Sequence, residues 1–408
     1  MARVLLITEV LPRDLSNGSD IRVQNFIKEL AKYHDCCLVV LDNTPIDECV
    51  RKKLGVREIC VFPSIPRSTK SLMRHFRISN SQVLRKSYPG FLLKIRSEVD
   101  TLIRDRRIEL IFCLDPLTAE FVIDQTIPKL LDYCDSRTLT YRRMMASRAS
   151  SMPMSSRFRG YVDYLRQRRR ERHLVRTFEF TTTISPSDKQ CLVEVAAVQD
   201  GVVVVVPNGV SPDALRVQAK ADGRRRSVVF WGNLDFPPNW TAIDYFYQEI
   251  YLPYLAEKQV EWHIIGRGAN DSIKKLAEQP GIFLHGFVDD LYGEISQHGA
   301  MVNPMIEGSG LKNKVLEAFA CRLPVVSTTM GIEGVGAVRG QVCVVADEAE
   351  KFADAVIRVL DDQVLADEFS ANARRFVEDN YTWETVGFRL NEVVTVALGN
   401  ASSAKEST

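Results

Sequence analysis

The stretch at residues 306–328, IEGSGLKNKVLEAFACRLPVVST, restricts the fold of this chain more than any other. A glycine-rich turn at 307–310 precedes apolar residues at helical spacing, and Pro324 leads from this helix into a short apolar strand at 325–327. Backbone N–H groups can approach a ligand closely at glycine, and the free N–H groups of a helix N-terminus attract anions. The pattern therefore predicts an anion-binding turn, with the helix N-terminus at Gly310 and Leu311.

Two charged residues of this helix have a spacing that suits a nucleotide diphosphate. Lys314 and Glu317 are three residues apart, so they share one helix face. The lysine can contact phosphate oxygens there, and the carboxylate can accept hydrogen bonds from sugar hydroxyls. An ordinary turn with a helix cap and a surface charge pair would have the same residues, so the spacing alone leaves both interpretations open.

Strand-like and helix-like segments alternate along the rest of the chain, which predicts parallel sheets covered by helices. The first such unit is a strand at 3–9, a helix at 21–33 and a strand at 36–41, and a second α/β unit begins with a strand at 227–233. No G-x-G-x-x-G motif follows the first strand, where the loop contains only Gly18. This counts against an oxidoreductase that binds a dinucleotide.

Length and composition agree with a soluble globular protein of two domains. A chain of 408 residues is too long for one typical domain, and 45 % apolar and 26 % charged residues are usual for globular proteins. The nine cysteines form no C-x-x-C pair, which favours reduced thiols in a cytoplasmic enzyme over a disulfide framework or a zinc site. Since no signal-peptide pattern and no apolar run of about 20 residues is found, we expect a soluble or peripheral protein.

The net charge of +1 conceals strongly basic segments in the N-terminal half. Nearly all charged residues at 137–176 are arginines, and 67–107 is similarly basic. Such segments can contact anionic lipid headgroups or a diphosphate-linked acceptor, or they can be solvated helix faces. No aromatic platform is interleaved with the arginines, so we expect no nucleic-acid partner.

Polar residues follow several predicted strands, at the edge where open α/β sheets bind ligands. Asp135 follows the strand at 129–133 and is a candidate ligand contact or general base. Capping of the next helix by Asp135 or Ser136 is the alternative. Arg267, in the loop GRG after the strand at 260–265, can bind a phosphate with two hydrogen bonds.

The motifs of the C-terminal half resemble those of the family-4 retaining glycosyltransferases. The likeness is carried by SVVFWGNLDFPPNW at 227–240, IFLHGFVDD at 282–290 and the turn and helix at 307–318. It implies the α/β GT-B fold, in which two doubly wound Rossmann-like domains face each other across a cleft. We expect an N-terminal domain at 1–206 joined by a C-terminal helix at 383–398, a nucleotide-sugar-binding domain at 207–382, and a disordered tail at 399–408.

The resemblance also implies functions for individual residues. Arg267 and Lys314 would neutralise the leaving diphosphate, Glu317 would hold the ribose hydroxyls, and the backbone at Phe287 and Val288 would contact the base. The remaining donor-binding candidates are Gly18, Asn233, Gly266, Ser309, Gly310 and Leu311.

Two features depart from the family pattern. Members commonly have two glutamates separated by seven residues, but counting back from Glu317 gives Ser309. Either Glu307 takes the first acidic role or the backbone N–H groups at 309–311 face the sugar. The segment LDP at 114–116 stands where many members have a histidine, so no histidine role carries over.

The expected activity is transfer of a hexosyl-type sugar from a UDP- or GDP-sugar to a hydroxyl, with retention of configuration. The acceptor would be a glycan, a lipid-linked compound or a small molecule, in cell-surface polysaccharide or glycoconjugate biosynthesis. Catalytic candidates are Asp135, Arg267, Glu307 and Lys314. We expect no cofactor and no metal, because two cations are in place and no D-x-D motif is found. A cytoplasmic location is expected, with peripheral contact to the inner face of the membrane through the basic helices.

Two alternatives stay open. A catalytically silent sugar-nucleotide-binding subunit of a transferase complex would explain the missing glutamate and histidine. A GT-B sugar-nucleotide epimerase would need acid and base residues around the donor sugar.

Overall fold

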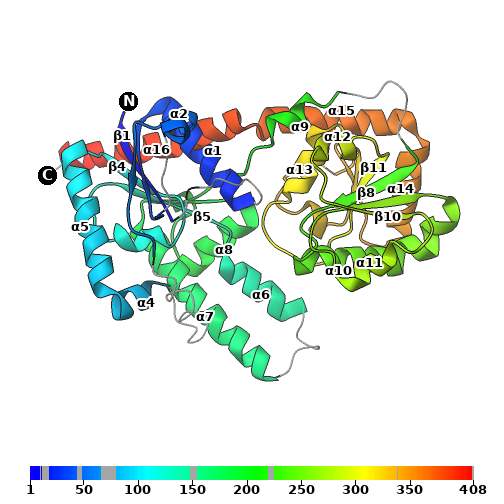
Figure 1. Cartoon of the computed structure of the whole chain (residues 1–408), viewed down its shortest axis with the longest axis horizontal. Coiled ribbons are helices and arrows are strands. Elements are labelled where there is room, and N and C mark those ends of the chain that lie inside the picture. The colour runs from blue at the N-terminus through cyan, green and yellow to red at the C-terminus, as the bar shows by residue number, and fades with distance from the viewer. Residues whose placement is uncertain are drawn as a thin grey trace. The chain divides into compact units, whose positions relative to one another are not determined.

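The computed structural model describes residues 1–9, 11, 18–43, 48–65, 80–147, 154–218, 225–337 and 339–406. The chain divides into two compact units: unit 1 comprises Met1–Pro207 and Val386–Thr408, and unit 2 comprises Asn208–Thr385. Each unit has its own sheet and its own buried apolar core (Figure 1).

The described part of unit 1 contains a parallel sheet of seven strands in the order β3-β2-β1-β4-β5-β6-β7. Starting from β1 the chain moves first to one edge and then to the other, which defines a doubly wound sheet. The central strands are continuous apolar runs because helices cover both of their faces. The strands are β1 (Arg3–Thr8), β2 (Asp35–Val40), β3 (Glu58–Val61), β4 (Leu110–Cys113), β5 (Lys129–Cys134), β6 (Phe180–Thr183) and β7 (Val203–Val205).

The helices of unit 1 begin and end at local sequence signals. α5 has proline in its first turn and ends at Arg107 in the left-handed conformation, and Ser185 caps α8 by accepting the Asp188 N–H at 3.2 Å. The helices described here are α1 (Gly18–Tyr33), α2 (Glu48–Leu54), α4 (Asn80–Ser87), α5 (Pro89–Arg106), α6 (Arg137–Ser147), α7 (Met154–Thr177), α8 (Pro186–Ala196), and the short η1 (Thr118–Phe121) and η2 (Asp200–Val202).

The sheet of unit 2 repeats the same winding. Its six described strands are parallel and lie in the order β10-β9-β8-β11-β12-β13. They are β8 (Ser227–Trp231), β9 (Glu261–Ile265), β10 (Ile282–Gly286), β11 (Ala300–Asn303), β12 (Val325–Ser327) and β13 (Val344–Val345).

The helices of unit 2 pack around this sheet, and the last helix passes from unit 2 into unit 1. They are α9 (Pro212–Arg216), α10 (Pro237–Tyr245), the π-helix η3 (Phe246–Leu255), η4 (Ala256–Lys258), α11 (Asp271–Leu276), α12 (Leu291–Ile295), α13 (Asn313–Ala320), η5 (Met330–Ile332), α14 (Ala349–Asp361), α15 (Gln363–Asn380) and α16 (Trp383–Glu406).

Two expectations were wrong in detail. The predicted disordered tail at 399–408 is helical as far as Glu406, because alanine, lysine and glutamate after Asn400 favour continuation of α16. The helix after the glycine-rich turn begins at Asn313 and not at Gly310, because Gly310 has a φ of 72° and cannot belong to a right-handed helix.

Two further observations concern the surface. None of the described helices is long and apolar enough to cross a membrane. The predicted basic segment at 67–107 is described only from residue 80 onward, so residues 66–79 lie outside the described part.

Candidate functional site

The loops after β8, β9 and β10 meet at the carboxyl ends of the unit 2 strands. The Gly232 N–H donates to Ile265 O at 3.0 Å, and the Gly266 N–H donates to Gly286 O at 2.8 Å. Gly266 has a φ of 154°, and a Cβ atom there would lie 1.9 Å from Gly232 O. Only glycine therefore allows these two strand ends to approach so closely.

Lys314 is placed over the end of β8 by the first turn of α13. Its Nζ donates to Asn239 Oδ1 at 2.8 Å and lies 4.0 Å from the centre of the Phe230 ring. Asn239 in turn donates from Nδ2 to Asn233 O at 2.8 Å, which fixes the amide. In the described part of the chain Lys314 has no ion-pair partner within 4.0 Å. The lysine is thus oriented by a neutral amide.

The environment of Lys314 disfavours its positive charge. The pKa of Lys314 is lowered to about 7, chiefly by burial and also by the nearby charge of Lys312, while the charge of Glu317 opposes both effects. An anionic ligand beside Nζ would restore the usual preference for the charged form. The charged form of Lys314 is therefore disfavoured in the unliganded protein.

Glu317 lies one helical turn after Lys314 and is fixed by an indole. Its Oε2 accepts a hydrogen bond from Trp231 Nε1 at 3.0 Å. Burial raises the pKa of Glu317, whereas the bond from Trp231 and the charge of Lys314 lower it. No residue in the described ranges donates to its second oxygen, Oε1. The carboxylate is thus held on one side and able to accept a ligand hydroxyl on the other.

The turn before α13 is held from inside by a second lysine. Lys312 is buried, and its Nζ donates to Ser309 O at 3.0 Å and to Gly310 O at 3.3 Å. Glu307 Oε1 accepts a hydrogen bond from Thr241 Oγ1 of α10 at 3.1 Å. The turn, including the half-buried Ser309 and the buried Leu311, is therefore anchored both to its own lysine and to α10.

Arg267 and Phe287 form an exposed stack on the neighbouring loops. The Arg267 guanidinium lies 3.9 Å from the centre of the Phe287 ring, and 60 % of Phe287 is exposed. Val288 beside it is half-buried. A planar cation on an exposed ring can meet both a phosphate and a flat heterocycle.

Two predicted site residues belong to unit 1. Gly18 is the first residue of α1, and Asp135 is exposed just after β5. Ser136 Oγ accepts the Leu139 N–H at 3.2 Å, so Ser136 caps α6, as the alternative for this segment proposed. Asp132, in contrast, is buried in a 2.7 Å ion pair with Arg22.

Sequence reasoning missed the residues that orient the predicted ones. Asn239, Trp231, Lys312 and Thr241 each hold a predicted site residue or its turn. Asn239 stood in the Pro-Pro-Asn motif and could have been chosen with Asn233. The other three carried no signal, because their partners are distant in sequence or ordinary in spacing.

Within the described residues, one group of side chains could hold a metal ion: Cys37, Glu58 and Cys60. They lie on β2 and β3 of unit 1 and not at the strand ends of unit 2.

Comparison with known proteins identifies the domain that carries the site. Residues 225–362 match the sequence model of the family described as Glycosyl transferases group 1. The matched residues all lie within unit 2. A Klebsiella pneumoniae protein described as "Uncharacterized 44.6 kDa protein in cps region" is 26 % identical over 171 residues. That match covers 40 % of this chain and 44 % of the relative, so the chain spans less than half the length of the curated relative it matches.

Solved structures match over nearly the whole chain. TarM has a TM-score of 0.68 at 12 % identity, covering 97 % of this chain and 99 % of TarM. Anabaena HepE in complex with UDP and glucose has a TM-score of 0.62 at 13 % identity, with coverage of 97 % and 100 %. Sucrose-phosphate synthase from Thermosynechococcus elongatus has a TM-score of 0.65 at 16 % identity, with coverage of 98 % and 100 %. These glycosyltransferase structures show that the fold is GT-B, which confirms the predicted fold class and resemblance.

Proposed function

We propose that the protein transfers a sugar from a nucleotide diphosphate donor, a UDP- or GDP-sugar, to an acceptor hydroxyl with retention of configuration. The observation that carries this proposal is the pair of fixed, half-buried side chains on α13: within the described residues, Lys314 has no ion-pair partner and Glu317 Oε1 accepts no hydrogen bond. Their spacing matches a phosphate next to a ribose. Anabaena HepE, which has the same fold, is known in complex with UDP-glucose.

The proposed chemistry is electrostatic. Lys314 and Arg267 contact the diphosphate and stabilise the charge that develops on it as the glycosidic bond to the donor breaks. Glu317 accepts a ribose hydroxyl through Oε1, and Phe287 with Val288 contacts the base. Glu307, held by Thr241, or the backbone at 309–311 faces the sugar. Because two protein cations neutralise the diphosphate, this step needs no metal ion. Asp135 of unit 1 is the candidate contact for the acceptor hydroxyl.

The proposed acceptor is a glycan, a lipid-linked compound or a small molecule. The relative whose printed description places it in a cps region supports a role in cell-surface polysaccharide synthesis. The alternatives are a silent sugar-nucleotide-binding subunit and an epimerase.

Helix α7 supports the proposed contact with a membrane surface from the cytoplasmic side. Four large apolar side chains of α7 are 80, 69, 51 and 41 % exposed: Met154, Phe158, Tyr161 and Leu165. At 3.6 residues per turn they lie within about 60° of one another. The opposite face packs on α6, where Gly160 lies near Met145 (Figure 1).

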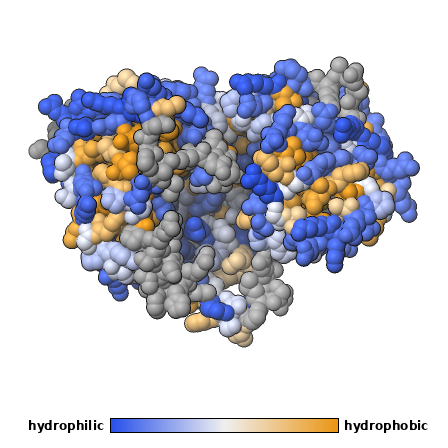
Figure 2. Space-filling model, in the orientation of Figure 1, coloured by the Kyte–Doolittle hydropathy of each residue, from blue (hydrophilic) through white to orange (hydrophobic). Residues whose placement is uncertain are grey.

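The charges of α7 indicate the kind of surface that this apolar stripe fits. Four exposed arginines lie beside or in line with it: Arg157, Arg168, Arg169 and Arg172. Apolar surface is visible at the lower end of α6 and α7 (Figure 2). An apolar stripe flanked by arginines is the pattern of a helix that lies on anionic lipid.

The proposed transfer is tested with purified protein and a panel of UDP-, GDP-, ADP-, TDP- and CDP-sugars. We expect one donor to be hydrolysed slowly without acceptor, and Lys314→Ala to bind its nucleoside diphosphate roughly 10- to 100-fold more weakly. Lys351→Ala, which removes an exposed lysine of α14, is the control. Nucleotide binding without hydrolysis or transfer would favour the silent subunit, and no nucleotide binding would overturn the site.

A further inference from the structure

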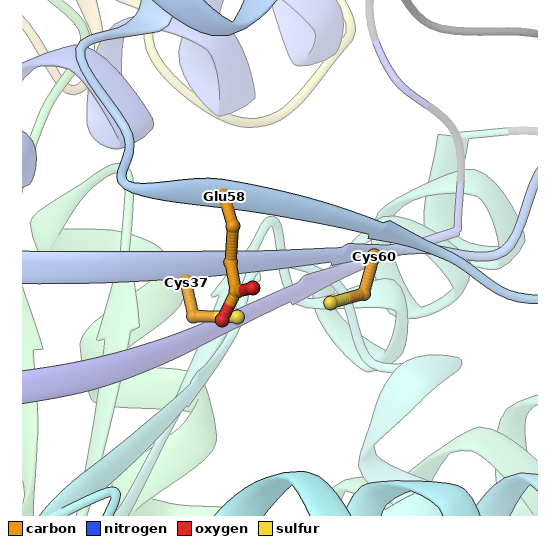
Figure 3. A group of neighbouring side chains, drawn as sticks. All are labelled: Cys37, Glu58 and Cys60. Atoms are coloured by element: carbon orange, nitrogen blue, oxygen red, sulfur yellow. The ribbon is translucent and has the colours of Figure 1, made fainter. Parts of the chain in front are cut away.

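Three side chains with metal-binding chemistry converge on one face of the unit 1 sheet (Figure 3). Cys37 lies on β2, and Glu58 and Cys60 lie on the neighbouring edge strand β3. The two Sγ atoms and a carboxylate oxygen lie within 4.8 Å of one another. We propose that these three residues bind Zn²⁺ or a similar thiophilic divalent cation.

The convergence follows from the register of the two strands. Cys37 is directly opposite Glu58, and Val39 is directly opposite Cys60. Because alternate residues of a strand point to the same face, Glu58 and Cys60 both lie on the face of Cys37. Two thiols and a carboxylate are a ligand set that zinc accepts, and a water molecule can complete its tetrahedron.

The charge around the group suits a divalent cation. Arg106, at the end of α5, donates from Nη2 to Glu58 Oε2 at 3.1 Å and from Nε to Oε1. Two thiolates and one carboxylate carry three negative charges, which a divalent cation and Arg106 neutralise together. Carboxylates that bind metals are usually oriented by a hydrogen bond from an outer group, and Arg106 has that position.

A disulfide is the main alternative for two neighbouring thiols. Both cysteines are free thiols here. Cys37 and Cys60 are diagonal neighbours, since each is opposite a different residue. Diagonal neighbours in a sheet have Cα atoms roughly 7–8 Å apart, which exceeds the ~4.4–6.8 Å that a disulfide usually spans. A metal ion can join the two sulfurs without moving the strands.

The position of the group indicates a structural role. Cys37 is buried, but Glu58 and Cys60 are half-buried at the sheet edge, so an ion can enter. A hollow of about 300 Å³ beside the group shares Arg106 with it. Cys37 and Glu58 lie near the amino ends of their strands, away from the edge where open α/β sheets bind ligands. The metal would fasten β3 to β2, independently of the proposed sugar transfer.

The test is titration of the reduced, metal-free full-length protein with Co²⁺, followed by displacement with Zn²⁺. We expect one Co²⁺ per chain, a thiolate-to-cobalt charge-transfer band in the near ultraviolet, and loss of the band when Zn²⁺ is added. Coordination releases the thiol protons to the buffer, so affinity should rise with pH.

Variants of the proposed ligands test whether the ion binds at this group. Cys60→Ser should abolish the charge-transfer band or weaken Co²⁺ binding at least tenfold, and Glu58→Gln, which keeps both thiols, should weaken binding but leave a band. Cys49→Ser, which removes the exposed cysteine of α2, is the matched control and should change nothing. The proposal is overturned if no band forms, if Cys60→Ser leaves the band intact, or if thiol counting finds Cys37 and Cys60 oxidised to a disulfide. Nucleotide binding by unit 2 is measured on the same samples and is expected to be unaffected.

Discussion

Lys314 is a half-buried cation whose hydrogen-bond partner, Asn239, is neutral. Burial costs a charged lysine free energy unless an anion is near, which is why its pKa is lowered to about 7. Near neutral pH the side chain is therefore divided between a charged and a neutral form. A diphosphate would favour the charged form, so proton uptake and nucleotide binding are linked at this residue.

This linkage predicts a pH dependence with opposite signs for binding and for stability. Affinity for UDP should fall as pH rises from 7 to 9, by up to about tenfold per unit, because free Lys314 loses its proton while the bound lysine keeps it. For folding, the unfolded lysine holds its proton up to its usual pKa of 10.5, so Lys314 should make the unliganded protein more stable as pH rises above 7. Calorimetric titration with UDP measures the first effect. Lys314→Met should remove most of the dependence of UDP affinity on pH. An unchanged pH dependence in that variant would contradict the assignment of this effect to Lys314.

At the scale of elements, the sequence predicted the strands better than the contacts between them. The strand at 325–327 was predicted to the residue, because a parallel strand buried on both faces is a short apolar run between turn signals. The start of α13 was misplaced because a glycine-rich turn gives no signal for the residue at which helical geometry begins.

Most of the missed site contacts join residues that are distant in sequence. Lys314 and Asn239 are 75 residues apart, and Glu317 and Trp231 are 86 apart. Cys37 and Cys60 lacked C-x-x-C spacing because their proximity comes from the register of β2 and β3. Single-sequence patterns describe neighbours along a helix or strand, so they could identify Lys314 and Glu317 but not the residues that hold them.

The close approach of the β8 and β9 ends makes Gly266 sensitive to substitution. Gly266→Ala should lower the free energy of unfolding of unit 2 by at least about 2 kcal/mol, because the new Cβ meets Gly232 O at 1.9 Å and the φ of 154° disfavours a side chain. Thermal or urea unfolding measures this loss. Gly90→Ala, at the start of α5 where no atom lies within 4 Å of the new Cβ, is the control and should be neutral or slightly stabilising.

The apolar stripe of α7 predicts binding to anionic vesicles. Sedimentation with vesicles that contain phosphatidylglycerol should carry the protein down, and neutral vesicles should carry down far less. Phe158→Ser combined with Leu165→Ser should reduce the bound fraction several-fold at unchanged thermal stability, because both side chains are exposed. Val364→Ser, which removes a 79 % exposed apolar residue from α15, should bind like the wild type. Equal binding of all three proteins would exclude α7 as the contact.

At the scale of the whole molecule, the two units have separate cores, and their tryptophans report on only one of them. All four tryptophans belong to unit 2: Trp231, Trp240, Trp262 and Trp383. Trp231 donates a hydrogen bond to Glu317, the candidate contact for the ribose. Tryptophan fluorescence therefore follows unfolding of unit 2, whereas far-ultraviolet circular dichroism follows the helices of both units.

Nucleotide should consequently stabilise one unit selectively. At 100 times its Kd, UDP should raise the tryptophan-monitored melting transition by an amount equivalent to about 2.7 kcal/mol. Circular dichroism should show a second melting transition whose temperature UDP does not change, because the core of unit 1 contains none of the residues assigned to the nucleotide. In Lys314→Ala the UDP-induced shift should largely disappear at the same UDP concentration. If UDP instead raised only the melting transition that tryptophan fluorescence does not detect, the nucleotide would bind to unit 1. That result would refute the assignment to α13.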